Sequence, residues 1–144
     1  MNKISNNDLL DAIREHEEET AEELALFSLS CEKESGGDVC YLITRDGFPG
    51  ENGKAVLRDL FETMLDQRCC PQYILLIDTA VKLLFSDSPF LRILKELDQN
   101  GAAVFASSAS AECYREEGGI DEYYLAPTGK LLTIMHRAKK VITI

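Results

Sequence analysis

Cysteine is the residue type in this sequence best suited to covalent chemistry, and the chain has five, at Cys31, Cys40, Cys69, Cys70 and Cys113. Cys113 follows Ser110 by three residues, at the expected start of a short helix. The positive end of a helix dipole favours a thiolate, so Cys113 is a candidate nucleophile. Its neighbours Glu112 and Glu116 oppose a thiolate, which favours the alternative that Cys113 is a small packing residue.

Two aspartates and several hydroxyl groups could form a second kind of site, one that binds a ligand. Asp46 and Asp78 each follow a predicted strand, and Thr79, Ser107 and Ser110 lie in similar positions. Because the carboxyl ends of parallel strands meet at one edge of a sheet, these side chains could bind a small polar molecule or Mg²⁺ there. In the alternative interpretation, the two aspartates only cap the turns that follow them.

Other chemistries lack the residues that they require. The glycines of segment 47–53 do not have the spacing of a phosphate-binding loop, and His16 has no second histidine at the spacing of a zinc-protease helix. The adjacent Cys69 and Cys70 have no third and fourth metal ligand nearby in sequence, and no Gly-x-Ser-x-Gly hydrolase motif is present. We therefore expect neither a metal nor a cofactor.

Composition and charge exclude whole classes of partner. The chain has 144 residues, the size of one domain, with 25 acidic and 15 basic residues and a formal net charge of −10. Such a charge repels the phosphate backbone of nucleic acids. No segment approaches the roughly 20 apolar residues of a membrane span, and the first residues lack the apolar core of a signal peptide. We expect a cytoplasmic protein that binds neither nucleic acid nor membrane.

Strand and helix patterns alternate along residues 39–144. Helical patterns occupy 53–67, 88–100, 110–117 and 128–138, and short apolar runs typical of strands occupy 39–44, 73–77, 102–106, 123–125 and 141–144. This alternation is typical of βαβ units, so we predict an α/β three-layer sandwich with a mainly parallel five-stranded sheet. The segment 1–38 differs, since it reads as an amphipathic helix within 6–27 and a connector.

Residues 79–101 resemble the DsrE-like half of YedF-type selenium-metabolism proteins, of the DsrE/DsrF/TusD superfamily. The resemblance rests on Thr79-Ala80-Val81-Lys82-Leu83, Ser88-Pro89-Phe90-Leu91, Leu94-Lys95-Glu96-Leu97 and Gly101. Matches at 46–48, 53–54, 71 and 138–142 extend it over residues 39–144. It implies a DsrE-like domain at 39–144 after an N-terminal helix and connector at 1–38, assembly into trimers or hexamers, and a cysteine after the third strand that carries a persulfide.

The sequence differs from that family at the sulfur-carrying loop. YedF-like domains commonly have two cysteines three residues apart there, whereas this chain has Ser107 and Ser110. A serine hydroxyl cannot form a persulfide, and without an adjacent base it is a poor nucleophile. We therefore predict a degenerate, non-catalytic binding or scaffold member of a sulfur or selenium relay, a homo-oligomer whose partner is a relay protein. The alternatives are a sulfurtransferase-like carrier that uses Cys113, and a protein that binds a small polar ligand at the strand edge.

Overall fold

The computed structural model describes residues 39–144, so the helix predicted within 6–27 lies outside the described residues. The described strands form one five-stranded parallel sheet in the order β4-β3-β2-β1-β5. Their bounds are β1 (Val39–Ile43), β2 (Tyr73–Leu76), β3 (Ala103–Ser107), β4 (Leu125–Ala126) and β5 (Lys140–Thr143). The predicted α/β fold with a five-stranded parallel sheet is confirmed.

The central strand β2 shows why the sequence forms this sheet. Its residues are apolar throughout, as expected for a strand whose two faces are both covered. Ile74, Leu75 and Leu76 are completely buried. Because side chains alternate across a sheet, Ile74 and Leu76 pack in one core and Leu75 in the other. The two cores are therefore specified by neighbouring residues of one strand.

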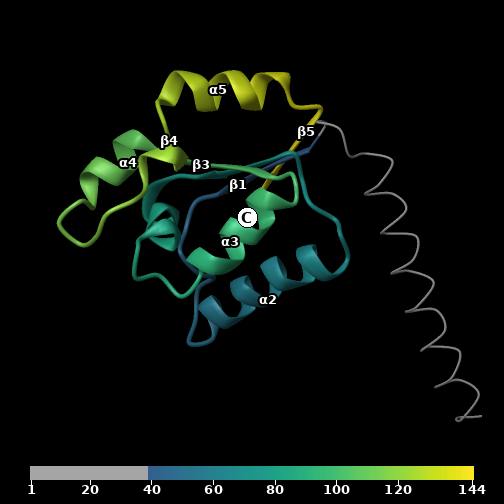
Figure 1. Cartoon of the computed structure of the whole chain (residues 1–144), viewed down its shortest axis with the longest axis horizontal. Helices are drawn as coiled ribbons and strands as arrows, with labels where there is room; N and C mark the ends of the chain where they lie inside the picture. The colour runs from purple at the N-terminus through teal and green to yellow at the C-terminus, as the bar shows by residue number, and fades with distance from the viewer. Residues whose placement is uncertain (1–38) are drawn as a thin grey trace, which may run out of the picture. The chain divides into compact units, whose positions relative to one another are not determined.

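Helices cover the two faces of the sheet unequally (Figure 1). Helices α2 (Gly53–Asp66) and α3 (Leu91–Gln99) lie on one face, and α5 (Thr128–Arg137) crosses the other. The first face holds the larger core, in which Leu57, Phe61 and Leu94 are almost completely buried. The opposite core is smaller and is covered by Leu131 and Ile134 of α5. The connections through α2 and α3 run one way along the sheet, and the connection through α5 runs the other way. Because connections between parallel strands are right-handed, opposite directions place their helices on opposite faces.

Three short elements, two of which follow strands at the carboxyl edge of the sheet, differ from the prediction. The sequence predicts a helix at 110–117, whereas α4 is Ser108–Cys113, because Ser107 caps the helix and it begins two residues earlier than expected. The segment after β2 forms an unpredicted 3-10 helix, η1 (Asp78–Leu84). A second 3-10 helix, η2 (Glu122–Tyr124), occupies most of the predicted strand 123–125.

No helix within 39–144 has the length and apolar character to cross a membrane.

Candidate functional site

A chain of hydrogen bonds joins the segments that follow β2 and β3. The hydroxyl oxygen of Ser107 accepts a bond from the backbone N–H of Ser110 (3.1 Å), and the hydroxyl oxygen of Ser110 accepts one from the backbone N–H of Asp78 (2.8 Å). The hydroxyl of Tyr114 donates to Oδ1 of Asp78 (2.8 Å). The structure thus brings together three predicted site residues and adds Tyr114. We call Asp78, Ser107, Ser110 and Tyr114 the serine network.

Local structure holds each end of the serine network. Ser107 ends β3, is 5% exposed, and has the extended backbone of a helix cap, so its oxygen satisfies an N–H that the first turn of α4 would leave free. Asp78 has a positive φ of 52°, a conformation that costs a non-glycine residue about 1 kcal/mol. The bond from its N–H to Ser110 holds it there. Backbone strain kept by its surroundings is a feature of functional sites.

Lys82 places a positive charge beside the serine network. Its Nζ lies 2.7 Å from Oε1 of Glu117 and 4.6 Å from the centre of the Tyr114 ring. The hydrogen bond to Glu117 raises the pKa of Lys82. The hydrogen bond to the Asp78 carboxylate raises the pKa of Tyr114, because ionisation would remove the donated proton and set two negative charges side by side. Both side chains therefore favour their protonated forms.

Asp46 lies in a neighbouring cavity and takes no part in the serine network. Its carboxylate is 3.5 Å from Nζ of Lys54, and a cavity of about 240 Å³ is lined by these two residues together with Lys82 and Asp87. The negative charge of Asp46 also raises the pKa of Lys82, so Lys82 lies near both features. Neither Asp46 nor Asp78 caps a helix. The residue before α2 is Asn52, not Asp46, and no side-chain hydrogen bond caps η1.

Thr79 and Cys113 are not joined to the other candidates. Thr79 lies in η1 and forms no side-chain hydrogen bond within residues 39–144. Cys113 is free and exposed, but the prediction that it lies in the first turn of its helix is wrong. Because α4 begins early, Cys113 is its last residue, at the negative end of the helix dipole. Cys113 therefore does not have the position at the start of a helix on which its candidacy rested.

The other free cysteines of the described chain are poor nucleophiles. Cys40 in β1 is completely buried, and burial raises the pKa of its thiol to about 11. Burial also raises the pKa of the half-buried Cys70. Both thiols therefore hold little thiolate near neutral pH. Among the described residues, no group of three or more His, Cys, Asp or Glu side chains could hold a metal ion.

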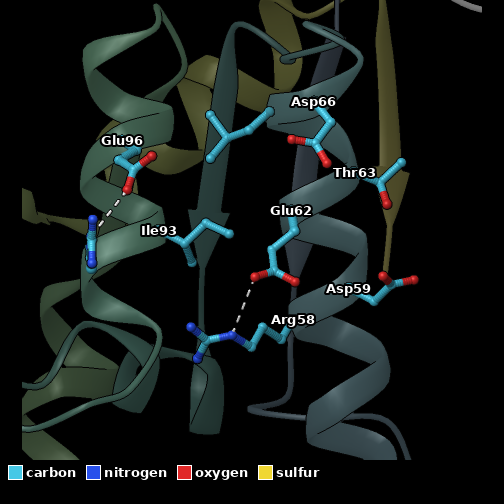
Figure 2. A pocket seen from close by; sticks show the side chains of 9 residues that line it. Arg58, Asp59, Glu62, Thr63, Asp66, Ile93 and Glu96 are labelled. Carbon is cyan, nitrogen blue, oxygen red and sulfur yellow. Dashed lines mark ion pairs between the residues drawn. The ribbon is translucent and has the colours of Figure 1, made fainter.

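A cavity of about 470 Å³ lies between α2 and α3, away from every predicted site residue (Figure 2). Two of its carboxylates already pair with arginines on their own helix, Glu62 with Arg58 (3.6 Å) and Glu96 with Arg92 (3.4 Å). These four side chains are about half exposed or more, so water screens the pairs. The cavity is a groove on a solvated helical surface, and its paired charges stabilise the helices that carry them.

Sequence reasoning misses Tyr114 and Lys82, and one of them leaves a signal. Tyr114 is four residues after Ser110, a spacing that places two residues on the same side of a helix. A phenol on the same side as the serine could therefore have been added to the candidates. Lys82 has no comparable signal, because its contacts with Tyr114 and Glu117 depend on how η1 packs beside α4.

Comparison with known proteins supports the fold. No family model and no curated protein matches the sequence. A solved structure that does match is the ychN protein from E. coli, with a TM-score of 0.58 and 13% sequence identity, over 76% of this chain and 100% of that one. That protein has a DsrE/DsrF-like fold, and the likeness supports a DsrE-like fold for this chain. At 13% identity the likeness establishes the fold alone.

Proposed function

We propose that this protein is a degenerate, YedF-like member of the DsrE-like fold class, a non-catalytic scaffold for partners in a sulfur or selenium relay. The observation that carries the proposal is the use of both loop serines as structural acceptors. Ser107 caps α4, and Ser110 holds the backbone of Asp78. The loop in which relatives carry a persulfide is here closed by its own hydrogen bonds, which suits a fixed recognition surface better than group transfer.

The position of Cys113 also supports a non-catalytic role. A sulfur carrier needs an accessible thiolate in an electropositive setting. Cys113 is exposed, but it ends α4, and Glu112 beside it pairs with Arg115 (2.8 Å). The positive charge next to this thiol is therefore already neutralised. If the protein does have catalytic activity, Cys113 is the residue that would provide it, as a sulfurtransferase-like carrier.

A sulfur-transfer assay tests the proposal. The protein is loaded with polysulfide, freed of excess reagent and mixed with a small thiol acceptor, and alkylated peptides are analysed by mass spectrometry. We expect the wild type and Cys113→Ser to transfer sulfur equally slowly. The double variant Ser107→Cys, Ser110→Cys restores the family's cysteine pair and serves as the positive control. Transfer by the wild type that disappears in Cys113→Ser would overturn the scaffold proposal and favour the carrier.

The proposal includes assembly into a homo-oligomer, a trimer or a hexamer. The edge strand β5 supports it: Val141 and Ile142 are 38% and 37% exposed, and an edge strand with exposed apolar side chains can pair with another chain. Light scattering should give three or six times the chain mass of 16.1 kDa. A monomer at micromolar concentration would contradict this part of the proposal.

A second candidate function is the binding of a small polar molecule in the cavity beside Asp46. The observation in its favour is the combination of two carboxylates with two ammonium groups around about 240 Å³, which suits a zwitterion such as a free amino acid. Thermal unfolding with a panel of amino acids tests it. A rise in Tm that disappears in Lys54→Gln, and persists in the surface variant Lys95→Gln, would support the function. An unchanged Tm with every compound would exclude it.

A further inference from the structure

The strand order of the sheet reverses at β1. From β1 the chain adds β2, β3 and β4 on one side, and it then returns to place β5 on the other side. In open parallel sheets, ligands bind outside the carboxyl ends of the strands at such a reversal. A cavity of about 210 Å³ lies there, lined by Ile144 after β5 and by residues that follow β1. The residues that line it include no member of the serine network.

The interior of this cavity is largely apolar. Leu57 of α2, which is 1% exposed, contributes to the lining, and Phe48, Pro49 and Ile144 supply further carbon surface. Its volume is below the roughly 300 Å³ at which sites for drug-sized ligands begin. A short hydrocarbon chain would fit this space, whereas a nucleotide cofactor would not.

Among the described residues that line this cavity, Arg45 is the only one whose side chain carries a charge. It is exposed, and its guanidinium forms no ion pair or hydrogen bond with any residue from 39 to 144. The next residue, Asp46, pairs with Lys54 and lines the other cavity. A guanidinium group binds a carboxylate through two parallel hydrogen bonds. The cavity thus combines an apolar interior with one anion-binding group at its edge.

The loop that forms one wall of the cavity is preorganised by its own backbone hydrogen bonds. The backbone N–H of Phe48 donates to the carbonyl of Gly53 (3.1 Å), and the N–H of Gly53 donates to that of Gly50 (3.2 Å). Gly53 is required for this close approach, because a Cβ there would overlap the carbonyl oxygen of Phe48. A wall that is already fixed loses little conformational entropy when a ligand binds.

We propose that this cavity binds a small amphipathic carboxylate. The hydrocarbon chain lies against Leu57 and Phe48, and the carboxylate pairs with Arg45. This site is separate from the loop after β3 and does not depend on the relay proposal, so either can fail without the other.

Sodium hexanoate is the probe for the test, with hexanol and acetate as matched compounds that lack the charge or the chain. The full-length protein with labelled isoleucine and leucine methyl groups is titrated and followed by NMR. We expect hexanoate to shift the methyl signals of Leu57 and Ile144, with hexanol and acetate each binding about tenfold more weakly. Absence of these shifts at millimolar hexanoate, or shifts at other methyl groups only, would overturn the proposal.

The substitution Arg45→Gln tests the role of the charge. We expect it to weaken hexanoate binding about tenfold and to leave hexanol binding unchanged. Arg92→Gln is the matched control, because it removes an exposed arginine of α3 that does not line this cavity. It should change neither hexanoate binding nor hexanol binding. Equal hexanoate affinity in the wild type and in Arg45→Gln would overturn the assignment of a carboxylate ligand.

Discussion

The two ends of the sheet's carboxyl edge use their polar groups in opposite ways. Beside β3, one acceptor atom of each of Ser107, Ser110 and Asp78 is engaged by a donor from the same group of segments or by a neighbouring phenol. Beside β1, a cavity of about 210 Å³ is open next to Arg45, whose side chain has no partner within the described residues. A cluster of polar residues in a sequence can therefore indicate a loop that stabilises itself, while the space for a ligand arises where the strand order changes.

The largest expected effect comes from the β1 end, at Gly53. In Gly53→Ala the new methyl group would overlap the carbonyl oxygen of Phe48, so the loop from 44 to 53 must move. We expect a loss of about 3 kcal/mol in the free energy of unfolding, measured by urea denaturation, because overpacking at a closed contact is costly. Binding of hexanoate should be lost as well.

Gly129→Ala is the matched control for this substitution. Gly129 lies in the first turn of α5 and has open space around it. Alanine there should raise stability by about 0.5 kcal/mol, because it lowers the entropy of the unfolded chain. Equal losses at the two glycines would show that the contact with Phe48 does not determine the shape of the loop.

An intermediate effect is expected at the β3 end, at Ser107. Removal of its hydroxyl in Ser107→Ala leaves the N–H of Ser110 without its cap, and we expect a loss of about 1 kcal/mol on urea denaturation. Ser108→Ala is the control, because the Ser108 side chain makes no hydrogen bond in the part of the chain that the structure describes. Its effect should stay within about 0.5 kcal/mol. A neutral Ser107→Ala would contradict the structural role of the serine network.

The smallest expected effect is on the titration of Tyr114. The pKa of this phenol is raised above its ordinary value of 10.0, chiefly by its hydrogen bond to Asp78. The stability it contributes is therefore complete below pH 10 and is lost as the pH rises through the higher folded pKa. Asp78→Asn removes the negative charge, so Tyr114 should ionise at lower pH in an ultraviolet absorbance titration.

Tyr123 gives an internal control for that titration. Its hydroxyl bonds to Asp98 (3.0 Å), which also raises its pKa, and Asp98 is unchanged in Asp78→Asn. The Tyr123 titration should therefore stay where it is. If the Tyr114 titration also stays unchanged in Asp78→Asn, its bond to Asp78 does not set its pKa.

Local patterns predict the sheet well. The apolar run of β2 and the strands on either side of it agree with the predicted positions to within one or two residues, because burial on two faces leaves a continuous apolar signal. The start of α4 is harder to predict, because Ser107, Ser108 and Ser110 are all residues that cap helices. The left-handed backbone at Asp78 leaves no mark in the sequence, so η1 is missed.

The candidate site is predicted less completely than the fold, because its bonds join distant residues. The bonds that Asp78 makes to Ser110 and to Tyr114 span 32 and 36 residues. Position at the end of a strand identifies the serines and the aspartate, but not the tyrosine that completes the network. The cavity beside Arg45 is beyond sequence reasoning, because its shape depends on the pairing of β5 with β1.

The pairing of β1 with β5 also has a consequence for folding during synthesis on the ribosome. Val39 at the start of β1 pairs with Lys140 of β5, so this edge of β1 cannot form its pairing until almost all of the described chain has been synthesised. Until then one edge of β1 has no partner strand and can pair with other nascent chains. Contacts between such distant residues also slow folding. We therefore expect the pairing of β5 with β1 to be the last step of folding, and this step also forms the cavity beside Arg45.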